Sequence, residues 1–195
     1  EHAREWYIIC FSYKWEHEKK THVVSLDDFD LYNEDPENDF DVVYKLWQLL
    51  DEADIVIGHN SDAFDIKKAN ARFVYHNFGP TGPYQTVDTL KIARKHFKFN
   101  SNRLGHLGEH LGLGGKEVTG GFQTWAGCMK GEAKAWGTMK KYAKQDVDLL
   151  VDVYERLRPW MTNHPNRNVI DSTSRQCPTC GSDRLQKRGV RCTRT

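Results

Sequence analysis

Two groups of polar side chains have types and spacings that could bind a divalent cation. The first follows the apolar run Ile55–Gly58 and contains Asn60 and Asp65. The second pairs Tyr142 with Asp146, four residues apart in a helical stretch, so both side chains lie on one face. Carboxylate oxygens suit Mg²⁺ and Mn²⁺, and polar groups after a strand lie where open α/β sheets place their active sites. The pattern indicates a metal-dependent nuclease.

Each group also has a simpler interpretation. Asp62 or Asp65 could be the ordinary N-cap of the helix that follows. The Asn-x₃-Phe-Asp pattern arises by chance in roughly one chain in fifteen, and Tyr-x₃-Asp is expected about 0.7 times per chain. The order of the two groups, a strand first and a helix later, favours the chemical interpretation.

The elements that must position these residues alternate along the chain. Hydrophobic periodicity and turn residues separate strands from helices. The expected strands cover 6–13, 20–26, 54–58 and 85–88, and the expected helices cover 40–50, 64–78, 89–97, 104–111 and 132–161. The strand at 54–58 is an apolar run typical of a buried strand. The alternation predicts an α/β sheet with helices packed on it.

Composition narrows the class of protein. The chain has 195 residues and is 38% hydrophobic, enough for one sizeable core and a small appendage. Its apolar runs are too short to span a membrane, and residues 1–5 lack the basic start and apolar core of a signal peptide. Five cysteines, two of them in a Cys-x-x-Cys pair, fit a reducing compartment. A cytoplasmic location without membrane contact is therefore expected.

Charge is distributed unevenly along the chain. Residues 27–41 contain eight acids and no Lys or Arg, which is typical of a solvated surface segment. From Asp171 onward six basic and two acidic residues give +4, so the net charge of +1 leaves −3 for the remainder. The basic end is either solvated or in contact with nucleic acid.

The two polar groups resemble motifs of the DnaQ-like, DEDD-type 3′–5′ exonucleases, which have an RNase H-like fold. The family's second motif, Asn-x₂₋₃-(Phe/Tyr)-Asp, corresponds to Asn60–Asp65, and its third, Tyr-x₃-Asp of the tyrosine (DEDDy) branch, to Tyr142–Asp146. The likeness covers residues 6–160, includes Asp88-Thr89, and is greatest for phage and bacterial exonucleases related to polymerase proofreading domains. It implies a mixed sheet flanked by helices, in a domain at 1–161.

The resemblance also implies roles for individual residues. Asp65 and Asp146 would be ligands of two Mg²⁺ or Mn²⁺ ions, and Tyr142 would orient the attacking water. The implied partner is single-stranded or 3′-end nucleic acid, with DNA expected, and a DNA polymerase domain or subunit is a further implied partner. The expected substrate contacts are Asn60, Phe64 and Lys144.

Lysines near Tyr142 have two interpretations. Lys140, Lys141 and Lys144 lie beside this face of the predicted helix and could meet phosphates. Solvated helix lysines are the simpler interpretation.

One family motif has no counterpart in the chain. No Asp-x-Glu stands in the first twenty residues, and Glu16 and Glu18 fall in a predicted loop. In the family that motif lies on the first strand, at the centre of a sheet ordered 3-2-1-4-5. We therefore expect a domain that begins after its first strand, lacks two of four carboxylates and is inactive by itself. The alternative is a catalytically inactive nucleic-acid-binding module with the same fold.

The carboxyl end contains half of a zinc-binding pattern. Residues 162–176 are polar and predict a linker, and Cys177-Pro-Thr-Cys180 has the spacing of half a zinc ribbon at 177–195. Cys192, with His164, could complete a Zn²⁺ site, and a redox Cys pair is a further interpretation. A half ribbon that binds Zn²⁺ weakly is the prediction.

Overall fold

The computed structural model describes residues 5–115, 121–165 and 184. Strands β1 (Cys10–Tyr13) and β2 (His22–Ser25) pair antiparallel, and β3 (Ile55–Gly58) and β4 (Gln85–Asp88) pair parallel. Within the described ranges these pairs form two separate two-stranded sheets. The predicted mixed α/β architecture is confirmed, with its sheet in two pieces.

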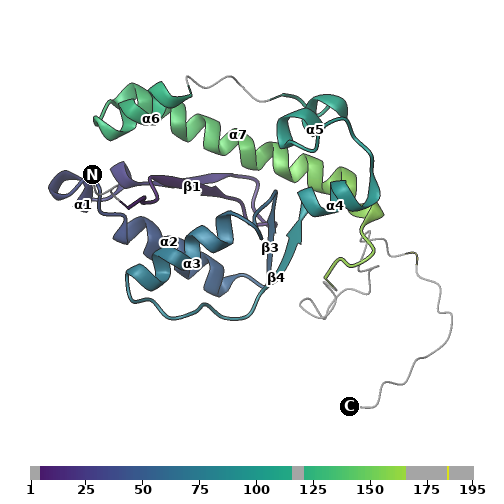
Figure 1. Ribbon diagram of the computed structural model, residues 1–195, viewed down its shortest axis with the longest axis horizontal. Coiled ribbons are helices and arrows are strands. Elements are labelled where there is room, and N and C mark those ends of the chain that lie inside the picture. The colour runs from purple at the N-terminus through teal and green to yellow at the C-terminus, as the bar shows by residue number, and fades with distance from the viewer. Residues whose placement is uncertain (1–4, 116–120, 166–183, 185–195) are drawn as a thin grey trace, which may run out of the picture.

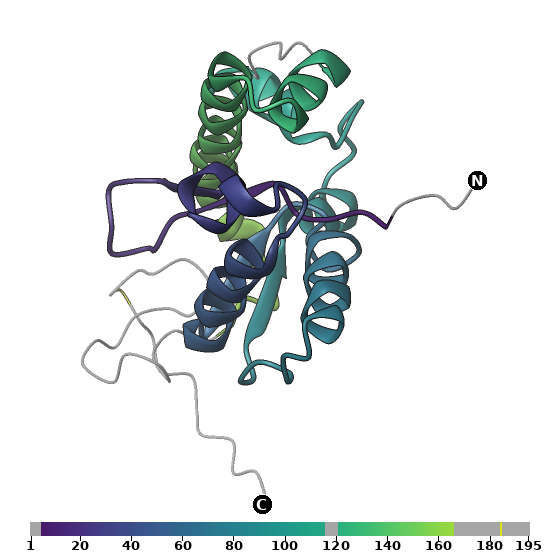
Figure 2. The ribbon, with the colours of Figure 1, turned by 90° about the vertical axis from the view of Figure 1, so that its left-hand side faces the viewer.

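Helices cover both faces of the strands. The long helix α7 crosses the molecule together with α5 and α6 on one side, whereas α2 and α3 lie on the other (Figures 1 and 2). Helix α7 contacts β1, β2, α4, α5 and α6, so it connects most of the fold. The helices are α1 (Leu31–Glu34), α2 (Phe40–Glu52), α3 (Asp65–Tyr75), α4 (Thr89–His96), α5 (Leu104–His110), α6 (Phe122–Met129) and α7 (Ala133–Leu157), with 3₁₀ turns at Leu26–Asp28 and Arg158–Trp160.

Three apolar clusters hold these layers together. The largest joins β4, α4 and α5 to the second half of α7, with Val87, Leu107 and Val153 at its centre. Another packs β1, the segments just before β1 and just after β2, and the start of α2 against α6 and the first half of α7, and includes Cys128. A small third cluster fills the space between α2 and α3. Because α7 contributes to the two larger clusters, it holds the β1–β2 pair and the β3–β4 pair against the same helix.

Strand β3 is less buried than its sequence predicts. Ile55 and Val56 are half-buried, and Ile57 is 37% exposed. An apolar run without alternation is typical of a parallel strand that is covered on both faces. Here β3 has a neighbouring strand only on the β4 side among the described residues. The prediction of a buried strand was therefore wrong for Ile57, because the opposite edge of β3 faces a cleft.

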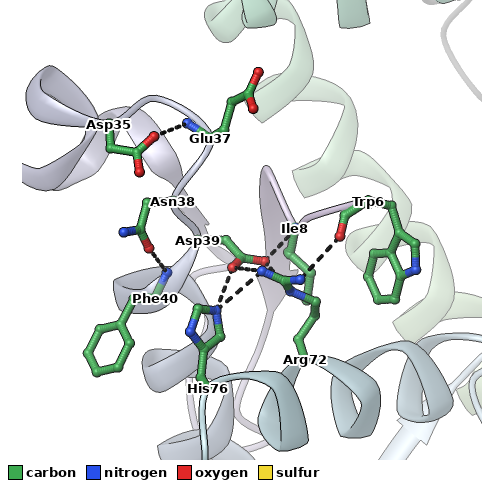
Figure 3. Close-up of polar contacts among 9 residues, drawn as sticks. All are labelled: Trp6, Ile8, Asp35, Glu37, Asn38, Asp39, Phe40, Arg72 and His76. Carbon is green, nitrogen blue, oxygen red and sulfur yellow. Dashed lines mark hydrogen bonds and ion pairs between the residues drawn. The ribbon is translucent and has the colours of Figure 1, made fainter. Parts of the chain in front are cut away.

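A buried ion cluster joins the segment before β1 to α2 and α3 (Figure 3). The carboxylate of Asp39 is fully buried and accepts hydrogen bonds from Arg72 Nε at 2.8 Å and from the backbone N–H of Ile8 at 2.8 Å. His76 Nε2 lies 2.6 Å from the same carboxylate. Arg72 also donates to the carbonyl of Trp6 at 3.3 Å. The prediction that the acidic segment 27–41 is solvated was wrong for Asp39.

Two more acids of that segment form ion pairs with α7. Lys140 Nζ lies 2.8 Å from Asp27 and 2.8 Å from Asp28. These bonds raise the pKa of Lys140 against the opposing effect of burial, and keep it charged. Lys140 therefore holds the β2 end against α7, and neither phosphate contact nor free solvation describes it.

Two cysteines of the described body lie close together in the core. Cys128 is buried and Cys10 half-buried in the same cluster. Burial raises the pKa of the Cys10 thiol to about 12, with a further contribution from Cys128. A thiol with such a pKa carries almost no thiolate near neutral pH, so Cys10 is poorly suited to nucleophilic chemistry.

The expected linker and zinc-ribbon half lie almost entirely outside the described residues. This holds for Cys177, Cys180 and Cys192, and those predictions stay predictions. The end of the described body packs on α7, where Tyr154 Oη lies 2.7 Å from His164 Nε2. In the part of the chain that is described, no helix combines the length and apolar character needed to cross a membrane.

Candidate active site

A cleft of about 2490 Å³ opens between the β1 and β3 edges. One wall comes from α7, and another from the loop after β3 and the start of α3. Lys144 is exposed on α7 and does not line this cleft. Five of the six candidate residues for catalysis and substrate contact do line it: Asn60, Phe64, Asp65, Tyr142 and Asp146.

Asp65 stands in the first turn of α3, and Phe64 occupies the N-cap position. No side chain caps this helix by a hydrogen bond, so the N-cap interpretation fails for both Asp62 and Asp65. Asp65 is exposed, but its side chain lines the cleft and is partly desolvated there. This desolvation raises the pKa of Asp65 against a hydrogen bond from its own backbone N–H, and the Asp88 carboxylate raises the pKa further.

The loop that carries Asn60 is held by Asp88, a buried carboxylate at the end of β4. Its oxygens accept the backbone N–H groups of Asn60 at 2.9 Å and Asp62 at 3.4 Å. The same carboxylate caps α4 by accepting from Leu90 at 3.0 Å and Lys91 at 3.4 Å. Asn60 has φ 69°, a left-handed conformation that Asn tolerates better than most residues. Asp88 therefore holds the backbone of Asn60 in position at the cleft.

His59 connects this loop to two other segments, a role that the sequence analysis missed. Its Nδ1 lies 2.9 Å from Thr89 Oγ1, and its Nε2 lies 2.9 Å from the carbonyl oxygen of Asn102. The Thr89 hydroxyl in turn donates to the carbonyl of Gly58 at 2.9 Å. The available signal was position, because His59 directly follows the end of β3. Its bonds tie β3, α4 and the segment before α5 together behind the candidate site.

Tyr142 and Asp146 lie one turn apart on α7, as predicted from their spacing. Both side chains are half-buried and line the cleft, and Asp146 Oδ1 is buried. Between them, the carbonyl of Ala143 accepts a hydrogen bond from Ser12 Oγ at 2.7 Å. This bond fixes β1 along α7 next to the two candidate residues.

Aromatic and basic side chains also line the cleft. The ammonium of Lys68 lies 3.6 Å from the Trp6 ring centroid and 5.7 Å from that of Phe64. Trp125 of α6 lines the cleft as well and is 50% exposed. Sequence reasoning missed Trp6, Lys68 and Trp125, because no local spacing relates them. Exposed rings and cations are side chains on which nucleic-acid bases and phosphates bind.

The carboxylates of the cleft do not complete a metal site. Across residues 5–115 and 121–165, no three His, Cys, Asp or Glu side chains gather closely enough to hold an ion. Asp65 and Asp146 have the oxygen chemistry that Mg²⁺ prefers, but two carboxylates are only part of such a ligand set. The described residues therefore do not fit a two-ion centre by themselves.

Replacing Asp65 with asparagine should increase the free energy of unfolding at pH 7 and leave it nearly unchanged at pH 3. The native state raises the pKa of Asp65 above its ordinary value of 3.8, so it binds a proton more tightly than the unfolded chain. Stability is therefore lost as pH rises from that value through the raised pKa, and asparagine removes the loss. Urea unfolding at the two pH values measures it. Lower stability at pH 7 would show that the helix dipole's attraction for this carboxylate outweighs its burial.

Comparison with known proteins identifies the domain. A family model described as the RNase H superfamily matches residues 3–158. No curated protein and no solved structure matches the chain significantly. The matched range contains Asn60–Asp65 and Tyr142–Asp146, and it contains the β1–β2 and β3–β4 strand pairs. It also contains the α7 wall of the cleft and the wall formed by the loop after β3.

Proposed function

Because the chain belongs to the RNase H superfamily, we propose that it is the body of a metal-dependent 3′–5′ exonuclease of the DEDDy type that acts on nucleic acid, with DNA as the expected substrate. The observation that carries this proposal is that Asn60, Asp65, Tyr142 and Asp146 all line one cleft. The first two come from the strand-to-helix junction, and the last two come from a helix about eighty residues later.

The proposed roles follow from the chemistry of each side chain. Asp65 and Asp146 would contribute carboxylate oxygens to metal binding. The Tyr142 hydroxyl would orient water from the α7 wall. Asn60 and Phe64 would contact the nucleic acid at the N-terminal end of α3. A bound divalent ion would supply Lewis-acid stabilisation of the charge on phosphate.

The proposed activity needs carboxylates beyond those described. We expect the 195-residue chain to show little or no Mg²⁺-dependent release of nucleotides from a 3′-labelled single-stranded oligonucleotide. The chain lengthened ahead of Glu1 by an apolar strand with Asp-x-Glu, called here the lengthened chain, should degrade it from the 3′ end. A lengthened chain with Asn-x-Gln in place of Asp-x-Glu is the matched control.

Two outcomes would contradict the proposal. Robust hydrolysis by the 195-residue chain itself would mean that the ligands have been misassigned. Failure of the lengthened chain to hydrolyse any 3′ end, although folded, would favour a second candidate function. That candidate is a nucleic-acid-binding module without catalysis, and the lack of a three-ligand cluster among the described residues favours it. Such a module would still bind the labelled oligonucleotide, which fluorescence anisotropy detects.

A further inference from the structure

Helix α2 presents a row of aromatic rings outside the cleft. Phe40, Tyr44 and Trp47 are spaced four and three residues apart, so they share one face of the helix. The ring centroids of Phe40 and Tyr44 lie 6.3 Å apart with their planes inclined by 13°, and those of Tyr44 and Trp47 lie 6.4 Å apart with their planes inclined by 3°. These three residues, called here the aromatic ladder, do not line the cleft.

The aromatic ladder is exposed to solvent but anchored to the fold. Phe40 is 40% exposed and Tyr44 is 43% exposed, whereas Trp47 packs against the apolar cluster between α2 and α3. Phe78, from the segment after α3, contacts all three rings at interplanar angles between 56° and 65°. Single exposed rings are ordinary, but exposed rings in contact with one another are typical of an interaction surface. Because these rings are held in place beforehand, a partner loses less entropy in binding them.

One end of the aromatic ladder already binds an extended segment of the chain. Residues 79–84, Gly-Pro-Thr-Gly-Pro-Tyr, form no helix and no strand. The indole N–H of Trp47 donates to the carbonyl of Gly79 at 2.8 Å, and the backbone N–H of Gly82 donates to the Asp51 carboxylate at 2.7 Å. Asp51 follows Trp47 by one helical turn and therefore lies on the same face of α2. This face thus binds a proline-containing backbone.

The shape of the aromatic ladder favours a polyproline II segment as its partner. Such a segment has no internal hydrogen bonds and is extended before it binds, and proline-rich segments dock on surfaces lined by aromatic rings. It rises ~3.1 Å per residue, so about four residues cover the three rings. An amphipathic helix would need a hydrophobic groove, and a β-strand would need an unpaired strand edge. A row of rings on one helix offers neither.

The charge around the aromatic ladder specifies the flanks of the partner. Residues 34–52 contain seven acids and one base, Lys45. Asp39 is neutralised within the buried ion cluster, whereas Glu37 is exposed and Asp41 is half-buried at the N-terminal end of α2. Arginine or lysine side chains are attracted to such a surface, and a phosphate backbone is repelled by it. The charge therefore favours a basic polypeptide over nucleic acid.

We infer that the aromatic ladder is a docking site for a proline-rich, basic segment of a partner protein. The prolines of that segment pack on Phe40 and Tyr44, and the Tyr44 hydroxyl donates to one of its carbonyls. Its flanking basic side chains lie near Glu37 and Asp41. Because the aromatic ladder lies outside the cleft, the partner binds without competing with a substrate. The inference does not depend on hydrolysis of nucleic acid.

A fluorescein-labelled peptide tests the docking site. The probe has a proline-rich core of about six residues between two pairs of arginines. One control peptide has glycine in place of the core prolines, which removes the preformed extended conformation, and a second has glutamate in place of the arginines. Fluorescence anisotropy with the 195-residue chain should show binding of the probe and about tenfold or more weaker binding of each control. Added salt should weaken the binding of the probe.

A pair of protein variants locates the binding. Tyr44→Ala removes the central ring of the aromatic ladder and should weaken binding of the probe by about tenfold. Phe122→Ala removes a ring that is 85% exposed on α6 and should leave the affinity unchanged. Circular dichroism checks that both variants are folded. Binding of a labelled single-stranded oligonucleotide should be the same for Tyr44→Ala and the wild-type chain, which separates this site from the cleft.

Four results would overturn the inference. The first is absence of probe binding by the folded chain, and the second is equal affinity of the Tyr44→Ala and Phe122→Ala variants for the probe. The third is displacement of the probe by a single-stranded oligonucleotide, which would assign the aromatic ladder to nucleic acid. The fourth is a dimer in a sedimentation experiment that Tyr44→Ala dissociates, which would assign it to a second copy of the chain.

Discussion

Replacing Asp39 with alanine should lower the free energy of unfolding by about 3–5 kcal/mol. Its carboxylate is fully buried and neutralises Arg72, whose side chain is also buried. The substitution would leave that guanidinium charged, desolvated and without its bidentate partner, and would leave the N–H of Ile8 without its acceptor. For a chain of this size the thermal midpoint should fall by roughly 6–20 °C. Circular dichroism on heating measures it.

Two comparisons separate the effect of breaking the buried ion pair from the effect of removing any acidic side chain. Asp35→Ala removes an exposed acid of the same segment, which accepts a 3.3 Å bond from the Glu37 N–H (Figure 3), and should change stability by less than about 0.5 kcal/mol. The double variant Asp39→Leu, Arg72→Met removes both charges together and should be more stable than Asp39→Ala. An Asp39→Ala protein as stable as the Asp35→Ala protein would mean that water enters and solvates Arg72.

The ion pairs explain why the acidic segment was misread from sequence. A window of residues 27–41 contains acids and no base, so its local pattern is that of a solvated surface. The partners lie far away, with Arg72 33 positions from Asp39 and Lys140 more than 110 positions from Asp27 and Asp28. Only the folded arrangement brings these charges together, and no periodicity encodes it.

Elements with strong local signals were predicted closely. Strand β4 has the predicted bounds of 85–88, and α2 begins at Phe40 as its apolar stripe indicates. The predicted strand at 6–13 is reduced to Cys10–Tyr13, because the Trp6–Ile8 segment bonds to Arg72 and Asp39 instead of to a strand.

Helix α6 was missed in the sequence because its large apolar residues are exposed and its smaller residues are the buried ones. Its apolar residues Phe122, Trp125 and Met129 are exposed, whereas Thr124, Gly127 and Cys128 are the buried ones. Gly127 is needed there, since a Cβ would lie 2.6 Å from that of Ala135 on α7. A helix that packs through small residues does not show the apolar stripe by which helices are recognised.

The candidate site was predictable from the sequence only in part. Tyr142 and Asp146 share one helix face, and this follows from their spacing alone. That α7 and the loop after β3 line the same cleft does not follow from any local signal in the sequence. The role of Asp88 as holder of the Asn60 loop depends on a left-handed residue and four backbone N–H groups, which sequence does not reveal.

In the lengthened chain defined above, Asp146→Asn should reduce Mg²⁺-dependent release of 3′ nucleotides by orders of magnitude. The side chain lines the cleft from α7 and has a buried Oδ1. Asparagine keeps its size and one oxygen but removes the negative charge, which is what a hard divalent cation needs from its ligand. Because the change is nearly isosteric and Asp146 is only half-buried, the thermal midpoint should change little. Tyr142→Phe should cost less, since it removes a hydroxyl that would orient water and not a metal ligand.

Asp152→Asn is the matched control for this experiment. Asp152 lies on the same helix and is exposed outside the cleft, so the same loss of charge there should leave the rate of nucleotide release unchanged. Comparing the two variants at several Mg²⁺ concentrations separates weaker metal binding, which excess metal would restore, from loss of the chemical step. Equal rates for Asp146→Asn and Asp152→Asn would show that Asp146 holds no metal. The catalytic carboxylates would then have to be sought elsewhere in the cleft, beginning with Glu109, which lines its α5 side.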